Sequence, residues 1–394
     1  MFIHIVLILI TTATGGGTDE SQSIKRNKAR HYPPVVLSAL PSEEDIPERW
    51  DWRNVSGVNY LTVNLNQHIP TYCGSCWLHA GIAVLNDRLK IARGAKWPEI
   101  SLARQVVLNC GAKVAGSCEG GSDYGVFVFG HKFGIPDDTC QPYDAHEHFC
   151  TPFRNCMNCD PPLEPTLGAQ AEKKQRCYPV QRYGRYFVRE FGRMKRPTVA
   201  AMQAEIRTRG PISCSVDASS LEYGRYKVGD IITFSLDDKR TQKLADSAAA
   251  AAKAAGGKSP ETTTGEATET ISTGTGELVI SWEPDHDVEI VGWDQDEQGT
   301  HWIVRNSWGG YWGESGIFKV RLGANSMGIE DLCHWAVIDP EPVVDDWGPD
   351  DSTRIFASTD EQPEDDERWK DVVPRIYRKI ARKHPESLVD PLLM

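Results

Sequence analysis

The chain has 394 residues, enough for one large domain or two ordinary ones. Hydrophobic residues make up 40% of it and charged residues 25%, a composition typical of a globular protein with a sizeable core. The formal net charge of -12 argues against a nucleic-acid partner, because no strong positive field is available to attract phosphates. All 11 cysteines lie between Cys73 and Cys333, and an odd number leaves one thiol over once the others have paired.

The N-terminus predicts a secretory signal peptide over residues 1–16. Its short apolar stretch is followed by small residues and is too short to span a membrane as a helix. The usual basic residues before it are missing, and a truncated or mis-assigned start is the alternative. The polar residues 17–45 indicate a short removable pro-segment. No later stretch is apolar enough to span a bilayer, so we expect a lysosomal or secreted protein, whose oxidising compartment suits the cysteine count.

Hydrophobic periodicity predicts helices early in the chain and strands later. One helix follows Cys76, where the apolar residues of one face are Leu78, Ile82, Leu85 and Leu89. A second helix is expected at residues 101–107. Residues 279–320 are rich in β-branched and aromatic residues interrupted by Gly, which indicates antiparallel strands. We therefore expect an α+β, two-lobed domain over residues 46–343, with an N-terminal helical lobe and a C-terminal antiparallel β lobe.

Two segments lie outside this pattern. Residues 238–278 form a low-complexity insertion rich in Ala, Thr and Gly, for which we expect a brief helix at most. Residues 344–394 form a C-terminal extension, an acidic stretch followed by a basic one. The basic stretch has helical spacing of apolar residues, which suits a partner or membrane-surface helix, but a weakly folded solvated tail is the simpler expectation.

The motif Cys73-Gly-Ser-Cys76-Trp77 carries the strongest chemical signal. A free thiol has a pKa of about 8.5, so little reactive thiolate exists at neutral or lysosomal pH. A helix N-terminus and a neighbouring histidine both favour the thiolate. Because a helix is expected to begin at Cys76, we assign Cys76 as the candidate nucleophile and as the thiol left over by the odd count.

The partners of Cys76 are expected far along the chain. His286 borders a β-rich run and can take the thiol proton, while the side-chain carbonyl of Asn306 can hold the other ring nitrogen. Trp308 would cover this pair and keep water out. Gln67 precedes the cysteine motif, and its amide can donate to the developing oxyanion together with the backbone N–H of Cys76.

These segments resemble the papain family of cysteine peptidases over about residues 46–340, and within it the cathepsin Z group. The insertion His68-Ile69-Pro70 carries the resemblance to that group, as do the segments 50–60 and 117–121. The resemblance implies a two-domain papain fold without cofactor or metal, and carboxypeptidase action on peptides or proteins with a free C-terminus. It also implies cystatin-type inhibitors as partners, and we expect a monomer.

The same resemblance implies roles for individual residues. His68 would anchor the terminal carboxylate of the substrate, Tyr72 would border the same end of the cleft, and Gly121 would offer its backbone to the extended substrate. The ten cysteines other than Cys76 would form the pairs Cys73–Cys118, Cys110–Cys150, Cys140–Cys156, Cys159–Cys177 and Cys214–Cys333. Asn54-Val-Ser56 is a glycosylation sequon.

The chain also departs from the family pattern. Cys76 and His286 are 210 residues apart (286 minus 76), against the about 130–150 expected, and the insertion accounts for much of the excess. No cysteine precedes Cys73, whereas the cathepsin Z group has a pro-segment cysteine that bonds to the catalytic thiol. The C-terminal extension is foreign to the family.

Plainer alternatives exist for the cysteines. Cys73-x-x-Cys76 and Cys156-x-x-Cys159 have the spacing of zinc-binding pairs, and the first also resembles a thioredoxin-type motif. Trp77 and the distant histidine and asparagine segments disfavour the zinc alternative, and the thioredoxin alternative is disfavoured because no βαβ pattern surrounds the motif.

The histidines have alternatives too. His286 could be a buried structural residue and His68 an ordinary loop residue, whereas His79, on the helix of Cys76, is interpreted as structural. At the level of function, the alternatives to a carboxypeptidase are a papain-type endopeptidase and a binding protein that keeps only the fold. The presence of all four expected catalytic residues disfavours the last.

Overall fold

The computed structural model describes residues 42–43, 46–160, 177–221, 226–233 and 284–346, together with the backbone of three strands between residues 261 and 281. All of these residues belong to one compact unit, Val36–Met394. The expected signal peptide lies outside the described residues. So does the expected pro-segment apart from residues 42–43, and the C-terminal extension beyond residue 346.

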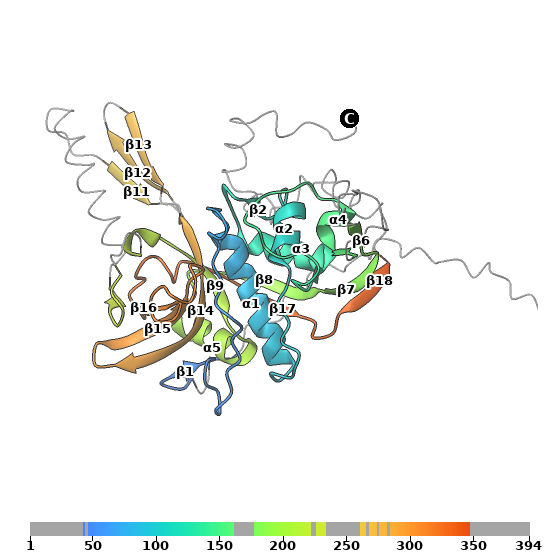
Figure 1. The fold of residues 1–394 in the computed structure, drawn as a ribbon. Helices are drawn as coiled ribbons and strands as arrows, with labels where there is room; N and C mark the ends of the chain where they lie inside the picture. The colour runs from blue at the N-terminus through green and yellow to red at the C-terminus, as the bar shows by residue number, and fades with distance from the viewer. Residues whose placement is uncertain are drawn as a thin grey trace, which may run out of the picture. The chain divides into compact units, whose positions relative to one another are not determined.

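The chain begins with helices and ends with longer strands as expected, except that the last helix lies between strands of the large sheet (Figure 1). The helices are α1 (Cys76–Ala92), α2 (Arg104–Cys110), α3 (Asp123–Phe133), α4 (Pro152–Asn155) and α5 (Val199–Arg209), with a 3₁₀ turn at Ala218–Ser220. The strands before α5 are β1 (Trp50–Asp51), β2 (Gly116–Ser117), β3 (Gly120–Gly121), β4 (Ile135–Pro136), β5 (Met157–Cys159), β6 (Cys177–Pro179), β7 (Arg182–Tyr186) and β8 (Val188–Lys195). Those after it are β9 (Ile212–Val216), β10 (Ile231–Ile232), β11 (Glu261–Thr264), β12 (Thr268–Thr273), β13 (Gly276–Ser281), β14 (His286–Asp296), β15 (Gly299–Arg305), β16 (Ile317–Arg321), β17 (Leu332–Ile338) and β18 (Val343–Asp346).

Helix α1 forms where the apolar periodicity predicts it. The residues of the expected face, Leu78, Ile82, Leu85 and Leu89, are all fully buried. Helix α2 starts three residues later than expected, at Arg104. The reason is that Leu102 forms a β-bridge with Asp137, so the preceding segment is held extended.

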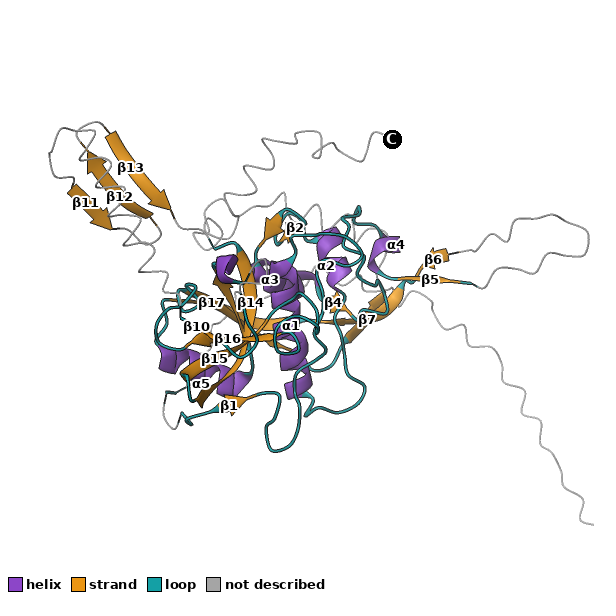
Figure 2. Cartoon of the chain, turned by 60° about the vertical axis from the view of Figure 1, so that its left-hand side comes forward, coloured by secondary structure: helices purple, strands orange, loops and turns teal. Residues whose placement is uncertain are grey.

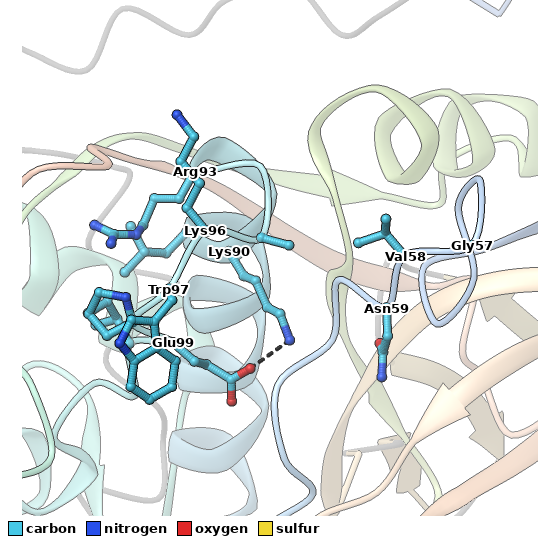
Figure 3. A pocket seen from close by; sticks show the side chains of 12 residues that line it. Gly57, Val58, Asn59, Lys90, Arg93, Lys96, Trp97 and Glu99 are labelled. Atoms are coloured by element: carbon cyan, nitrogen blue, oxygen red, sulfur yellow. Dashed lines mark hydrogen bonds and ion pairs between the residues drawn. The ribbon is translucent and has the colours of Figure 1, made fainter.

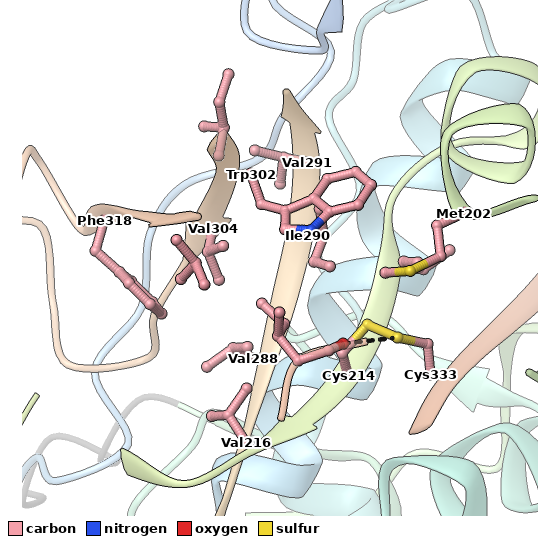
Figure 4. Close-up of a cluster of buried hydrophobic side chains, with 14 of the residues drawn as sticks. Met202, Cys214, Val216, Val288, Ile290, Val291, Trp302, Val304, Phe318 and Cys333 are labelled. Atoms are coloured by element: carbon pink, nitrogen blue, oxygen red, sulfur yellow. Dashed lines mark hydrogen bonds between the residues drawn. A yellow bond between two sulfur atoms is a disulfide. The ribbon is translucent and has the colours of Figure 1, made fainter. Parts of the chain in front are cut away.

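An eight-stranded sheet forms the β lobe, with the order β10-β16-β15-β14-β9-β17-β8 and β1 paired to β14. Its pairs are antiparallel except β10 with β16. Its strands supply most of a large apolar core, and the close-up shows side chains from β14, β15 and β16 around the Cys214–Cys333 disulfide (Figure 4). That disulfide joins β9 and β17 where Cys214 and Cys333 are directly opposite in register.

Two buried arginines join α1 to the β lobe. Arg88 of α1 donates hydrogen bonds of 2.7 Å to the carbonyls of Pro211 and Ala336. Arg305, the last residue of β15, pairs at 2.5 Å with Asp87 of α1 and with Glu289 of β14. Removing one partner of such a buried group costs about 3–5 kcal/mol, because the remaining charge is left unpaired. These contacts therefore fix α1, which begins at Cys76, relative to β14, the strand that begins at His286.

The insertion contains more regular structure than expected. Strands β11, β12 and β13 form a separate three-stranded antiparallel sheet, in which Thr262 is opposite Ile271 and Thr270 is opposite Val279 (Figure 2). The expectation of a brief helix at most was wrong for these residues. Their β-branched threonines, isoleucines and valines favour strands even in a segment of low complexity.

Candidate active site

Cys76 is the first residue of α1 and the free cysteine among the described residues. Ser75, the residue before it, makes no side-chain cap, so the first backbone N–H groups of the helix remain available near the sulfur. Backbone N–H groups of Trp77 and Asp287 hydrogen-bond to the Cys76 sulfur. The second contact places the sulfur against the start of β14, which is the position of His286.

His286 is buried and paired with Asn306. The Nε2 atom of His286 lies 2.8 Å from the Oδ1 atom of Asn306. The backbone N–H of Ser307 donates to the same oxygen at 2.8 Å, which fits its role as an acceptor and places the ring proton on Nε2. The Nδ1 atom of His286 then carries the free lone pair of the ring. Trp308 lies with its ring 5.2 Å from the His286 ring, and Trp312 packs edge-on against Trp308 at 5.2 Å.

Burial acts on the two partners in opposite directions. Burial, with the charge of the nearby Asp287 carboxylate as the second cause, raises the pKa of the Cys76 thiol to about 12. Burial lowers the pKa of His286. The sequence led us to expect a lowered thiol pKa, and the difference arises because a buried site disfavours either charge alone.

Gln67 is fixed by three contacts. Its Oε1 atom accepts a 2.6 Å hydrogen bond from the Ser307 hydroxyl, its Nε2 atom donates to the Cys73 carbonyl at 3.1 Å, and its backbone N–H donates to the Ser307 carbonyl at 2.8 Å. The Tyr143 hydroxyl donates to the Gln67 carbonyl at 2.8 Å and lies 2.7 Å from the Ser75 hydroxyl. One amide N–H of Gln67 is thereby used, and the second remains for a ligand.

His68 follows Gln67 and stacks on Tyr72. The two rings are nearly parallel, with centroids 4.7 Å apart and an interplanar angle of 8°. The Nδ1 atom of His68 is buried and has no hydrogen-bond partner among the described residues. Tyr72 is 76% exposed and Ile69 60% exposed, so the loop projects outward while the His68 nitrogen is covered.

Gly121 is in β3, where backbone and ring atoms leave no room for a side chain. A Cβ atom at this position would lie 2.4 Å from the Ala115 carbonyl oxygen and 2.6 Å from the Trp77 ring. Trp77 in turn donates from Nε1 to the Ser117 carbonyl at 3.0 Å. Only glycine fits, so the backbone of the β2–β3 hairpin is held close to the start of α1.

Five disulfides are present in the described residues. They are the pairs that the family resemblance implied: Cys73–Cys118, Cys110–Cys150, Cys140–Cys156, Cys159–Cys177 and Cys214–Cys333. The zinc alternative is wrong, because Cys73, Cys156 and Cys159 are each bonded to another cysteine. No group of three or more potential metal-binding side chains occurs among the described residues.

His79 is part of a structural network. Its Nδ1 atom lies 3.0 Å from the Ser75 carbonyl, and its Nε2 atom lies 3.3 Å from Arg104. Burial and the Arg104 charge lower the pKa of His79 to about 3. It is therefore neutral and engaged on both sides, as the structural interpretation predicts.

Sequence reasoning missed a buried acid beside the nucleophile. Asp287 accepts a 2.6 Å hydrogen bond from the Ser215 hydroxyl, and burial together with the Asp123 charge raises its pKa well above the usual range. Asp123 itself pairs with His334 at 2.8 Å. The adjacent His286 was the only signal in the sequence, because the Ser215, Asp123 and His334 contacts come from distant elements. Ser307 and Tyr143 were missed for the same reason.

Comparison with known proteins agrees with this geometry. The chain matches the profile of the papain family cysteine proteases over residues 46–245 and 241–337, which is most of its length. The chain belongs to the papain family of cysteine proteases. This papain-family protease has the α+β fold that the sequence predicted, and it is a cysteine peptidase.

Its relatives belong to more than one group of that family. The protease is 32% identical over 314 residues to "Cathepsin Z" of Onchocerca volvulus, covering 77% of this chain and 82% of that protein. It is 25% identical over 315 residues to "Cathepsin B-like cysteine proteinase 1" of Ostertagia ostertagi, covering 74% and 72%. Among solved structures, procathepsin L 3 of the Tenebrio molitor larval midgut matches with a TM-score of 0.49 at 19% identity, covering 79% of this chain and 75% of that one.

Proposed function

We propose that this protease is a carboxypeptidase that removes single residues from the C-termini of peptides and proteins. Cys76 gives its proton to His286 and attacks the last peptide carbonyl. The oxyanion accepts hydrogen bonds from Gln67 and from the Cys76 backbone N–H. His286, oriented by Asn306, then protonates the leaving amine, which departs as a free amino acid and leaves a thioester on Cys76. Water attacks the thioester, His286 takes its proton, and the shortened peptide leaves as a carboxylic acid.

The environment of His68 carries this proposal. His68 follows Gln67 directly, and its charge is the smallest of the causes that act on the pKa of His286, which supports a position near the reacting bond. Its buried Nδ1 atom without a partner is suited to donate to a terminal carboxylate, and stacking on Tyr72 holds the ring in place. Burial lowers the pKa of His68, so the charged form that binds a carboxylate best is favoured at acidic pH.

The supporting positions act on the substrate and on water. Trp308 shields the His286–Asn306 pair, and Gly121 offers its backbone to the extended chain of the substrate. No cofactor is needed for these steps. A cystatin-type inhibitor would occupy the same cleft, and the protease would act as a monomer.

Processing and location complete the proposal. Residues 1–16 direct secretion, residues 17–45 are removed, and residues 46–343 are the working domain. Five disulfides favour a lysosomal or extracellular setting. The exposed Asn54 of the sequon is accessible to glycosylation. No helix among the described residues is long and apolar enough to cross a membrane.

Paired peptides test the specificity. The same peptide with a free and with an amidated C-terminus is incubated with the processed enzyme, and the products are read by mass. We expect the acid to be cleaved much faster, with the preference growing at acidic pH, and His68→Ala to reduce the preference while the Cys76 thiol still reacts with iodoacetamide. His146→Ala, at an exposed loop histidine, is the control.

One observation favours an endopeptidase instead. The 60% exposed Ile69 and 76% exposed Tyr72 show a loop that projects outward, and such a loop would leave the cleft open to long chains. Equal cleavage of the acid and amide peptides, with products cut inside the chain, would support this alternative.

A further inference from the structure

A pocket with a basic wall lies at the far end of α1 from Cys76. It has a volume of about 590 Å³ and lies between the loop of Gly57, Val58 and Asn59 and the segment that runs from Leu89 to Ile100 (Figure 3). Helix α1 has 17 residues, so at 1.5 Å per residue the pocket is about 25 Å from the nucleophile. A ligand bound there would not block the catalytic cleft.

The charges of the pocket are only partly neutralised. Lys90 pairs with Glu99 at 2.6 Å. Lys96 is exposed and makes no ion pair with any residue that the structure describes, and the buried Nε atom of Arg93 has no hydrogen-bond partner among the described residues. Trp97 is 89% exposed at the same rim. The chain has a net charge of -12, so a pocket lined by positive side chains beside an exposed tryptophan is unusual on it. Such a pocket suits an acidic segment that also carries apolar side chains.

The chain itself supplies such a segment close by. The Pro340 carbonyl accepts a 3.5 Å contact from Arg93, so the chain passes the pocket shortly before β18 leads it to the extension. Trp347, Ile355 and Phe356 are apolar side chains of the following segment. Between residues 347 and 367 the one basic residue is Arg354, and the acidic ones are Asp350, Asp351, Asp360, Glu361, Glu364, Asp365, Asp366 and Glu367.

We propose that the pocket at the C-terminal end of α1 binds the acidic segment 347–367 of the same chain. From Asp346, the last residue of β18, to Asp360 is 14 residues (360 minus 346), and a random chain of that length has a root-mean-square span of about 20 Å. Such a tether gives the segment an effective concentration on the order of millimolar at the pocket, so individually weak ion pairs hold it there. The pairing fails at high salt, because exposed charges are screened.

Carbodiimide cross-linking of the full chain tests this pairing. The reagent activates a carboxylate, and a lysine amine in contact with it displaces the urea, which leaves an amide bond with net loss of one water. We expect mass spectrometry to find Lys96 joined to a carboxylate of residues 347–367, with the yield falling in high salt. A mixture of ¹⁵N-labelled and unlabelled protein should give no mixed cross-link. Mixed products would instead mean that the pocket binds the segment of a second copy.

Full-length variants give the controls. Glu364→Gln, Asp365→Asn, Asp366→Asn and Glu367→Gln are combined to neutralise the last acidic cluster, and we expect the Lys96 cross-links to that cluster to disappear and those to the rest of the segment to weaken. Lys96→Glu should increase the proteolytic sensitivity of residues 347–367 without changing turnover of a small substrate. Lys227→Gln, at an exposed lysine elsewhere on the β lobe, should leave the Lys96 cross-links and the proteolytic sensitivity unchanged.

Two outcomes would overturn the proposal. One is a segment that cross-links only to the basic residues that follow it, such as Lys370 or Lys379, with none to Lys96. The other is a Lys96→Glu variant with the proteolytic sensitivity of the parent. Neither outcome bears on carboxypeptidase specificity, which is measured at the opposite end of α1.

Discussion

The Ser307 hydroxyl donates a 2.6 Å hydrogen bond to the side-chain carbonyl of Gln67, although 240 residues separate them in the chain. A backbone bond from Gln67 to the Ser307 carbonyl reinforces this contact. Ser307 also follows Asn306 directly. The residue that orients the histidine and the residue proposed to bind the oxyanion are therefore held by one short segment, and a disturbance of Ser307 should reach both.

Ser307→Ala should lower kcat by about tenfold, because the Gln67 amide loses the bond that fixes its orientation. The effect should be smaller than that of Gln67→Ala, which removes the donor itself and should cost on the order of 10²–10³ in kcat. Steady-state kinetics on a peptide substrate measures both. Gln295→Ala, at an exposed glutamine on β14, is the matched control. A Gln67→Ala enzyme with parental kcat would show that Gln67 has no part in catalysis.

Cys76→Ala should abolish turnover, because the thioester cannot form without the sulfur. Iodoacetamide should label the parent enzyme once, at Cys76, since the other ten cysteines are bonded in pairs. Peptide mapping by mass spectrometry locates the label. Labelling at a second cysteine in an active enzyme would contradict both the disulfide pattern and the assignment.

Asn306→Ala should lower kcat more than it raises KM, because the orientation of His286 matters most in the transition state. The 2.8 Å contact between the two side chains is the geometric basis. Initial rates over a range of substrate concentrations separate the two parameters. Unchanged kcat with a raised KM would place Asn306 in substrate binding instead.

Asp287→Asn should shift the pH dependence of Cys76 alkylation to lower pH. Burial is the largest cause of the raised pKa of the Cys76 thiol, and the Asp287 carboxylate is the second. An amide of the same shape removes the charge of Asp287. The rate of iodoacetamide labelling, measured across pH, reports the shift. Asp294→Asn, at a half-exposed position on the same strand, should leave the profile unchanged. A parental profile for Asp287→Asn would show that its charge does not reach the sulfur.

The same substitution should alter stability with pH. Burial raises the pKa of Asp287 above its usual value of about 4, so the folded state holds the proton more tightly than the unfolded state. Stability from this group is therefore present below pH 4 and is lost as the pH rises through the folded pKa. Between pH 4 and the folded pKa of Asp287, the Asp287→Asn variant should therefore lose less stability than the parent. Urea denaturation of both proteins across pH measures the difference, and parallel curves would contradict it.

Deletion of residues 244–281 should leave the fold and the catalytic activity largely intact. Strands β11, β12 and β13 pair only with one another, so their removal breaks no hydrogen bond of the eight-stranded sheet. The melting temperature and kcat/KM of the deletion variant are the measurements. A variant that fails to fold under conditions in which the parent folds would show that the insertion belongs to the core.

Local patterns predicted the nucleophile helix and the strands late in the chain because each depends on short-range spacing. Leu78, Ile82, Leu85 and Leu89 recur at helical intervals, and all four are buried as that spacing requires. Motif chemistry also pointed to Cys76, His286 and Asn306 as candidates, and the folded chain joins His286 to Asn306. The sheet of β11, β12 and β13 was missed because the high Ala, Thr and Gly content of the insertion predicted irregular structure. The β-branched residues within the insertion favoured strands instead.

The sequence by itself determined which side chains are available: one unpaired thiol, a histidine and asparagine to activate it, and His68 beside the glutamine. Only the tertiary structure decided what surrounds them. It brought Ser307 to Gln67 and left the Nδ1 atom of His68 buried without a partner among the described residues. It also set the buried Asp287 against the Cys76 sulfur. The physical reason is that pKa values and hydrogen-bond partners depend on burial and on charges brought close by folding, and neither quantity can be computed from spacing along the chain.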